Sequence, residues 1–223
     1  GGMSWESSAQ YYRLINEDVR QRLGGAHSAQ LLLWSVDFAG IKQLQHDGDW
    51  DALGDHMADA ARRLQAGGAD LLLICTNTMH KLTDRIEATC PLPLLHIADP
   101  TANAIVQAGA RRVGLLGTAF TMEQDFYRGR LQERFGLEVL VPDAEDRRSV
   151  HDIIYQELIA GVVSEQSRQV YAAVIARLVA RGAEAIILGC TEIMLLVRPE
   201  DSAVPLFDTT TLHARAAVDA ALA

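Results

Sequence analysis

The fold is decided by two stretches, Leu71-Leu72-Leu73-Ile74-Cys75-Thr76-Asn77-Thr78 and Ile186-Ile187-Leu188-Gly189-Cys190-Thr191-Glu192. Each is a run of mostly branched apolar residues that ends in Cys-Thr followed by a polar residue. A short apolar run of this kind, preceded by Gly-Ala and an acidic residue, indicates a buried parallel strand. Each cysteine is therefore expected where a strand ends and a loop begins, at the sheet edge where open α/β folds bind ligands.

The composition excludes several classes of protein. The chain has 223 residues, of which 49% are apolar and 22% charged, with a net charge of −9. This balance argues against a surface for nucleic acid or anionic membranes, and no apolar run reaches the roughly 20 residues of a membrane span. Three cysteines without a CxxC pair argue against a disulfide scaffold or a zinc site. We expect a cytoplasmic protein.

The remaining chain alternates strand and helix patterns, which predicts the α/β class with a mainly parallel sheet. Segment 39–49 is expected to be a loop or a short helix. Helices are expected over 7–22, 50–66, 77–88, 101–108, 122–135, 149–159 and 166–181 and from residue 210 onward. Strands are expected over 30–38, 71–74, 92–97, 112–117, 138–141, 186–189 and 204–207.

The two halves of the chain correspond to one another, which indicates an internal duplication. The turn at 2–7 matches 117–122 with an offset of 115 residues (117 − 2), the same offset as between the cysteines (190 − 75). The Gly-Ala-acid triplets at 68–70 and 182–184 also correspond, as do the Pro-Leu segments at 93–95 and 205–207. We therefore predict two pseudo-symmetric lobes, residues 1–97 plus 208–223 and residues 98–207, with an active site in the cleft between them.

The paired cysteines predict proton-transfer chemistry. A thiolate is a competent base and a thiol a competent acid near neutral pH, and the reference pKa of about 8.5 falls at a helix N-terminus. A racemase requires two such groups on opposite faces of one carbon, so that one removes the proton and the other returns it. We interpret Cys75 and Cys190 as this pair. Cys90 has no counterpart in the repeat and is expected in the core.

Hydroxyl and amide residues at the predicted strand-to-helix turns are candidates for binding a substrate carboxylate. Their hydroxyl and backbone N–H groups could hold that group without a basic side chain and stabilise the charge that develops on it. Two further residues are candidate auxiliaries: His80, and Glu192, which could orient Cys190, raise its pKa, or cap the next helix. No metal or nucleotide motif is present. The turn residues are Thr76, Asn77, Thr78, Thr118, Thr121 and Thr191.

These motifs resemble those of the aspartate/glutamate racemase family of cofactor-independent amino-acid racemases. The resemblance covers essentially the whole chain, and segments 75–81 and 122–131 are similar to the bacterial L-aspartate/glutamate-specific and broad-specificity members. It implies two Rossmann-like lobes with four-stranded sheets, Cys75 and Cys190 as the two bases, no pyridoxal phosphate, and a homodimer. It also adds Met3 and Ser4, in the opening turn, to the substrate-binding residues.

Two departures from the family pattern affect these expectations. Family members have a strand before the Gly-Gly-Met turn, and the first lobe is therefore expected to lack its first strand. Strict aspartate racemases also have an Arg in the segment that corresponds to 38–45 and a Lys before the turn at 160–161. This chain has only Lys42 and Ile159 at those places. The absence of the Arg and Lys that strict aspartate racemases have at these places favours a broad or neutral substrate range.

Other functions are compatible with this sequence. Related folds catalyse maleate isomerisation, hydantoin racemisation and decarboxylation. Decarboxylation needs only one protonating cysteine, so the presence of two argues against it. A non-catalytic module that binds an amino acid is a further alternative, against which the two intact cysteines argue.

Overall fold

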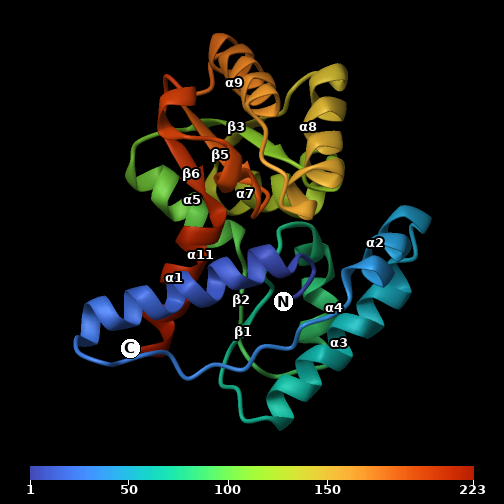
Figure 1. Ribbon diagram of the computed structural model, residues 1–223, viewed down its shortest axis with the longest axis vertical. Coiled ribbons are helices and arrows are strands. Elements are labelled where there is room, and N and C mark those ends of the chain that lie inside the picture. The colour runs from blue at the N-terminus through green and yellow to red at the C-terminus, as the bar shows by residue number, and fades with distance from the viewer. The chain divides into compact units, whose positions relative to one another are not determined.

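The computed structural model describes residues 1–223 as an alternation of helices and parallel strands (Figure 1). The chain divides into two compact units. The first contains Gly1–His96 and His213–Ala223, and the second contains Ile97–Leu212. None of the helices combines the length and the apolar character needed to cross a membrane.

The second unit is built on one four-stranded parallel sheet with the strand order β4-β3-β5-β6. Its strands are β3 (Arg112–Gly117), β4 (Glu138–Leu140), β5 (Ala185–Gly189) and β6 (Leu206–Asp208). Its helices are α5 (Ala98–Gln107), α6 (Ala119–Glu123), α7 (Asp125–Phe135), α8 (Ala144–Gln156), α9 (Glu165–Ala180) and α10 (Ile193–Leu196), with the 3₁₀ helices η2 (Leu158–Ala160) and η3 (Pro199–Asp201).

Helices cover both faces of this sheet, because successive residues of a strand point to opposite sides. On one face, Leu115 and Ile187 belong to a core that includes residues of α5 and α7. On the other face, Leu116 and Ile186 pack with residues of α8 and α9. The continuous apolar runs of β3 and β5 are thereby explained, since a strand buried on both faces has no polar side.

The two central strands end in a close contact between glycines. Gly117 of β3 is the register partner of Gly189 of β5. A Cβ atom built on Gly117 would lie 2.7 Å from the Gly189 carbonyl oxygen, and one built on Gly189 would lie 2.7 Å from the Leu116 carbonyl oxygen. Both positions therefore require glycine for a steric reason, and both immediately precede candidate site residues.

The first unit contains a two-stranded parallel sheet in which Leu72 pairs with Leu94. Apolar residues of α3, of β1 and of the segment that follows Cys75 form its core, including Leu53, Ile74 and Met79. The elements are α1 (Trp5–Leu23), α2 (Phe38–Asp47), α3 (Trp50–Ala66), β1 (Leu72–Leu73), η1 (Thr78–Leu82), α4 (Thr83–Glu87) and β2 (Leu94–Leu95), and α11 (Thr209–Ala221) ends in this unit.

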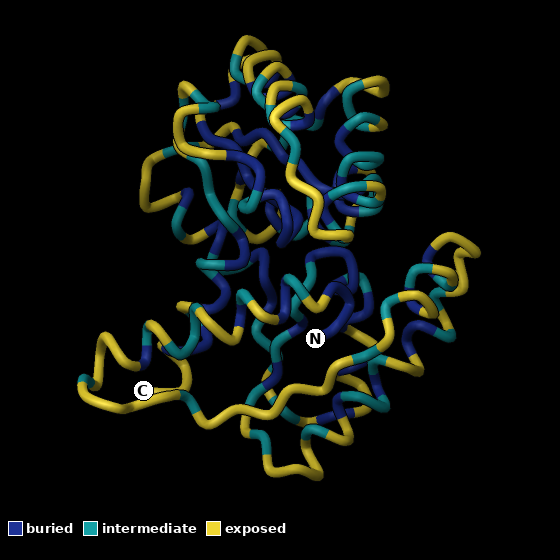
Figure 2. The backbone as a smooth tube through the Cα atoms, viewed as in Figure 1, coloured by how far each residue is buried: buried dark blue, intermediate teal, exposed yellow.

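The prediction of a strand over residues 30–38 is wrong. The first unit has two strands, instead of the three predicted for it and the four that the family resemblance implies. The segment is extended and largely exposed, as Figure 2 shows, and half of the Leu33 surface is accessible. The hydrogen bonds of its backbone are to Gly1. The Gly1 amino group donates to the Trp34 carbonyl (3.0 Å), and the Gly1 carbonyl accepts from Val36 N–H (3.2 Å). One residue of pairing does not make a ladder.

Most predicted helices agree with the observed ones to within three residues, and three differ more strongly. The helix expected over 122–135 is interrupted at Gln124, whose extended backbone separates α6 from α7. The helix expected over 77–88 consists of η1 followed by α4. The helix expected over 149–159 is α8, which begins at Ala144 because the Asp143 side chain caps it by accepting from Asp146 N–H (3.0 Å).

The internal repeat is visible in the backbone hydrogen bonds of the two units. After α3, Ala69 N–H donates to the Leu64 carbonyl (3.1 Å), and after α9, Ala183 N–H donates to the Leu178 carbonyl (3.0 Å). Both are the six-to-one bond of a Schellman motif, which ends a helix with a glycine at positive φ. That glycine is Gly68 in one unit and Gly182 in the other.

The hydrogen bonds also correct the register of the repeat. Ser4 caps α1 by accepting from Ser7 N–H, and Thr118 caps α6 by accepting from Thr121 N–H. These pairs are separated by 114 residues (118 − 4), as are the two C-terminal glycines (182 − 68), rather than by the predicted 115. Gly189 is the additional residue that brings the separation of the cysteines to 115.

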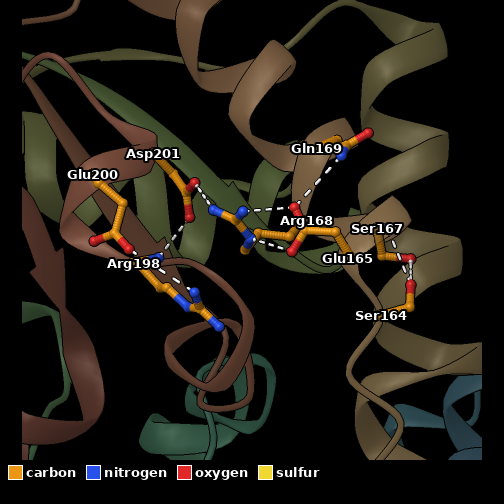
Figure 3. A network of polar contacts seen from close by, with 8 residues as sticks. All are labelled: Ser164, Glu165, Ser167, Arg168, Gln169, Arg198, Glu200 and Asp201. Atoms are coloured by element: carbon orange, nitrogen blue, oxygen red, sulfur yellow. Dashed lines mark hydrogen bonds and ion pairs between the residues drawn. The ribbon is translucent and has the colours of Figure 1, made fainter.

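A polar network fixes the segment that follows β5 in the second unit (Figure 3). Arg168 of α9 forms ion pairs with Glu165 and with Asp201 of η3, whose carboxylate is largely buried. The same carboxylate accepts from Arg198 N–H at 2.8 Å. The chain that leaves the second cysteine is therefore held against the start of α9.

Replacing Gly189 with alanine is expected to destabilise the protein. The added methyl group would clash with the Leu116 carbonyl and side-chain atoms of Leu115, and overpacking of this kind costs about 1–3 kcal/mol. Gly40→Ala is a matched control, because Gly40 lies in α2 with open space around it. It should be neutral or stabilise by roughly 0.5–1 kcal/mol. Chemical denaturation measures both, and equal stability of the two variants would contradict the close contact.

Candidate active site

Cys190 lies directly after β5 and is bonded to an acidic side chain. Its Sγ donates to Oε2 of Glu192 at 2.9 Å, and Thr191 Oγ1 donates to the same oxygen at 3.0 Å. All three residues are buried, with Cys190 8% and Glu192 4% exposed. One carboxylate oxygen thus holds both the thiol and the neighbouring hydroxyl in place.

The expected lowering of the thiol pKa by a helix N-terminus is wrong. Burial raises the pKa of Cys190 well above its ordinary value, and the negative charge of Glu192 adds to this effect. Burial also raises the pKa of Cys75. The helices that follow are short, four residues in α10 and five in η1, and both begin three residues after their cysteine.

Thr118 and Thr121 lie beside Cys190. Because Gly117 and Gly189 are register partners, Thr118 leaves β3 at the edge where Cys190 leaves β5, and adjacent strands are about 4.8 Å apart. Thr118 Oγ1 accepts from Thr121 N–H, and the two hydroxyl oxygens lie 3.3 Å apart. We call Thr118, Thr121, Cys190, Thr191 and Glu192 the Cys190 half-site.

The first unit brings Ser4 and Cys75 together through Ser7. Ser4 Oγ accepts from Ser7 N–H at 3.1 Å, and Ser7 Oγ donates to the Cys75 carbonyl at 3.2 Å. Cys75 itself is partly exposed. The Met3 side chain, by contrast, packs in the core of this unit and is 5% exposed. The predicted opening turn is therefore adjacent to the cysteine, but the Met3 side chain is directed away from solvent.

The Thr76-Asn77-Thr78 segment is held by His80. His80 Nδ1 lies 2.8 Å from the Thr76 carbonyl oxygen, and His80 N–H donates to the Asn77 carbonyl at 3.1 Å. Asn77 and Thr78 are buried, whereas Thr76 is partly exposed. We call Ser4, Cys75, Thr76, Asn77 and Thr78 the Cys75 half-site.

His80 belongs to a buried cluster with His96, His213 and Tyr11, which the sequence analysis missed. The ring centroid of His80 lies 4.5 Å from that of His96 and 5.8 Å from that of His213. Since a carbonyl only accepts, His80 Nδ1 donates to Thr76, and His213 Nε2 donates to the Leu95 carbonyl at 2.9 Å. His213 Nδ1 in its neutral form then accepts from the Tyr11 hydroxyl at 2.8 Å. No group of side chains suited to hold a metal ion is found.

Two further residues near the Cys190 half-site were missed. His151 and Tyr155 are four residues apart on α8, with ring centroids 4.6 Å apart. Burial raises the pKa of Tyr155, and the nearby Cys190 and Glu192 contribute to the increase. The signal in the sequence was the i, i+4 spacing of the two rings, which places them on one helix face. Cys90, in contrast, lies in the core of the first unit, as predicted.

The fold defines the class of protein, a parallel α/β fold in which each of two units has a cysteine and hydroxyl side chains after a strand. The sequence identifies the family within that class. The chain belongs to the Asp/Glu/Hydantoin racemase family, whose pattern matches residues 1–217. Membership of this family supports amino-acid racemase activity.

Individual relatives agree with this assignment. A proposed Asp/Glu racemase from Yersinia pestis is 56% identical, with a TM-score of 0.92 over 100% of this chain and 97% of the other. An aspartate racemase homologue from Pyrococcus horikoshii is 31% identical, with a TM-score of 0.85 over the same shares. A broad specificity amino-acid racemase of Bacillus subtilis is 26% identical over 78% of this chain and 75% of its own length.

Replacing Glu192 with glutamine should make Cys190 more reactive. The amide keeps an oxygen that can accept from the thiol but removes the negative charge, so the pKa of Cys190 should fall, and each unit of pKa is worth a factor of ten in the thiolate-to-thiol ratio. Alkylation rates measured against pH by mass spectrometry give the midpoint for each cysteine. Cys75 in the same molecule is the control, and an unchanged or higher midpoint for Cys190 would contradict the assigned role of Glu192.

The stability of the protein should decrease as the pH falls below about 6.5, the ordinary histidine pKa. Burial lowers the pKa of His80 well below that value, and the neighbouring His96 and His213 lower it further. The unfolded chain therefore takes up a proton that the folded chain does not, at a cost of about 1.4 kcal/mol per pH unit in this window.

The measurement is chemical denaturation between pH 7.5 and 5.5, roughly the range around the ordinary histidine pKa. His80→Asn, which keeps a donor for the Thr76 carbonyl, should reduce the pH slope. His27→Asn alters an exposed histidine and should leave the slope unchanged. Equal slopes in the wild type and His80→Asn would show that His80 does not contribute.

Proposed function

We propose that the protein is a pyridoxal-phosphate-independent amino-acid racemase in which Cys75 and Cys190 act on one α-carbon. The observation that carries the proposal concerns the strand before each cysteine. In both units this strand is parallel to its neighbour and donates a backbone hydrogen bond to the carbonyl of a proline. Leu72 N–H donates to the Pro93 carbonyl and Ile186 N–H to the Pro205 carbonyl, both at 2.9 Å. The duplicated framework thus carries a thiol in each unit.

In the proposed reaction, the thiolate of one cysteine takes the α-proton, so that the Cα–H bond breaks and an S–H bond forms. The electron pair passes into the substrate carboxylate, and the thiol of the other cysteine then delivers its proton to the opposite face of Cα. After one turnover the protonation states of the two cysteines are exchanged. No external oxidant, reductant or cofactor enters this balance.

The two cysteines differ in their resting state under this proposal. Cys190 donates to the Glu192 carboxylate, which favours the protonated thiol. The residue two positions after Cys75 is Asn77, which carries no charge. We therefore assign Cys190 as the resting acid and Cys75 as the residue that loses its proton first.

The remaining half-site residues are proposed to bind the amino acid. In the second unit the hydroxyls of Thr118, Thr121 and Thr191 would do so. Thr118 leaves β3 at the sheet edge where Cys190 leaves β5, Thr121 bonds to Thr118, and Thr191 follows Cys190 in the chain. Ser4, Thr76, Asn77 and Thr78 would do so in the first unit. For Met3 the proposal is limited to its backbone, because its side chain lies in the core. His80 is proposed to orient the Thr76–Thr78 segment.

The substrate is proposed to be aspartate, glutamate or a broader set of amino acids. Ile159, at the position where strict aspartate racemases have a Lys, packs against an apolar core and offers no charge for a side-chain carboxylate. The Bacillus subtilis relative is a broad specificity amino-acid racemase, which supports the broader range. Hydantoin racemisation is the second candidate, because the family also comprises hydantoin racemases. A homodimer in the cytoplasm is part of the proposal and is testable by light scattering and fractionation.

The decisive experiment follows loss of the α-proton signal by NMR in D₂O. The panel contains both enantiomers of aspartate, glutamate, homoserine and several neutral amino acids, together with a substituted hydantoin. The wild type should exchange the α-proton of at least one member and invert it. Cys75→Ala and Cys190→Ala should each lose racemisation by at least about 100-fold, the lower end of what one positioned acid or base contributes.

Cys90→Ala is the matched control, because Cys90 is a buried core thiol whose Sγ contacts the Ala61 carbonyl and Gln65 rather than either half-site. It should keep wild-type activity. If Cys75→Ala or Cys190→Ala racemised at the wild-type rate, the two-base mechanism would be abandoned. Turnover of the hydantoin alone would replace the amino-acid substrate with the second candidate.

A further inference from the structure

His151 makes a direct contact with the backbone of the Cys190 half-site. Its Nδ1 lies 3.2 Å from the backbone nitrogen of Ala119, the residue between Thr118 and the rest of α6. A backbone N–H can only donate, so His151 Nδ1 must accept with its lone pair. The neutral ring therefore carries its proton on Nε2. The contact joins α8 to the turn that carries Thr118 and Thr121.

His151 is the middle member of a row on α8 that faces this region. Arg147, one turn earlier, forms an ion pair with Glu123 of α6 at 2.9 Å. Tyr155, one turn later, lies against His151 with the two rings tilted by 42°, and the charges of Cys190 and Glu192 contribute to the raised pKa of Tyr155. The spacing i, i+4, i+8 keeps the three side chains on one side of the helix.

The turn that His151 contacts has little freedom to move without disturbing the half-site. The Thr121 Cβ atom would lie 3.2 Å from a Cβ on Gly117, and its Cγ2 atom 3.6 Å from one on Gly189. Thr121 therefore packs directly on the glycine pair that ends β3 and β5. A displacement of Ala119 would alter the positions of the Thr118 and Thr121 hydroxyls relative to Cys190.

We infer that His151 is a positioning residue, which in its neutral form holds the Thr118–Thr121 turn in place beside Cys190 and on protonation releases it. An imidazolium has two N–H donors and no acceptor, so it cannot accept from Ala119. The inference rests on the proposed function, because it takes the turn to be part of the substrate site. It predicts that substrate binding, rather than proton transfer, depends on the ionisation of His151.

The titratable and charged groups around His151 have defined partners. Arg147 and Glu123 are paired with each other, Tyr155 is kept neutral by burial, and Cys190 is bonded to Glu192. Substituting His151 therefore separates the effect of its ionisation on KM from the effects of these other groups. KM should rise as the pH falls through the pKa of His151, whereas kcat should follow the cysteines.

The test compares His151→Asn with His151→Leu. Asparagine provides an oxygen that can accept from Ala119 N–H but does not ionise, so its KM should stay close to the wild-type value at high pH and lose the rise at low pH. Leucine provides no acceptor, and its KM should be about five- to tenfold higher across the range, as expected for one lost hydrogen bond. Neither should change kcat by more than about twofold, and His56→Asn, on the exposed surface of α3, is the control.

An NMR measurement tests the contact between His151 and Ala119 without turnover. Its outcome therefore does not depend on whether the proposed function is correct. In ¹⁵N-labelled wild type, the Nδ1 shift of His151 should be that of an unprotonated nitrogen near neutral pH, and the Ala119 amide should titrate with the same midpoint as the ring. A protonated Nδ1, or an Ala119 amide that does not respond to the ring, would overturn the inference. So would a low-pH rise in KM that persists in His151→Asn. Lack of turnover by the wild type alone would overturn the proposed function.

Discussion

The second unit depends on the contact between the backbones of Gly117 and Gly189. Two neighbouring parallel strands end in glycine at the same level, and a methyl group on either residue would meet a carbonyl oxygen at 2.7 Å. The absence of side chains lets Thr121 pack on the glycine pair. It also lets Thr118 and Cys190 leave the sheet side by side. The geometry of the candidate site is therefore a consequence of backbone packing in the sheet.

The repeat shows which parts of this framework are shared and which have diverged. Both units end a helix with the same Schellman bond and anchor the following strand to the carbonyl of a proline. In the second unit alone, Gly189 lengthens the strand by one residue before the cysteine, and Glu192 bonds to the thiol. In the first unit, the Ser7 hydroxyl bonds to the cysteine carbonyl. The framework is thus repeated while the electrostatics of the two thiols differ.

The sequence predicted those elements whose pattern reports a local property. The strand over 112–117 and the helix over 50–66 have the predicted bounds, because a doubly buried strand and a capped amphipathic helix are specified by their own residues. The segment 30–38 has an equally apolar pattern but no ladder, since β-structure requires a partner that the pattern does not contain. Apolar alternation predicts a surface suited to pairing, and pairing itself is a tertiary property.

The position of the candidate residues in the fold was predictable from the sequence, but their electrostatics were not. The half-site hydroxyls lie near their cysteines within each unit because parallel strands end at one edge. The direction of the thiol pKa was predicted incorrectly, because burial of Cys190 and the charge of Glu192 act against ionisation and outweigh a helix terminus that begins three residues away. The i, i+4 spacing places His151 and Tyr155 on one helix face, but their partners could not be found from local sequence. His151 accepts from Ala119, 32 residues away, and His213 of the histidine cluster bonds to Tyr11, 202 residues away.

The difference between the two thiols has a defined kinetic consequence under the proposed mechanism. The two enantiomers of an amino acid have equal free energy in water, so the equilibrium constant of racemisation is one. It follows that kcat/KM must be equal for the two directions, whatever the protein does.

The carboxylate beside Cys190 and the amide at the equivalent position after Cys75 cannot favour one direction overall. They can only change how the activation free energy for each enantiomer is divided between substrate binding and proton transfer. The enantiomer with the higher kcat therefore also has the higher KM. An acidic residue in one half-site is therefore compatible with a racemase, because it alters the two resting states and leaves the overall equilibrium unchanged.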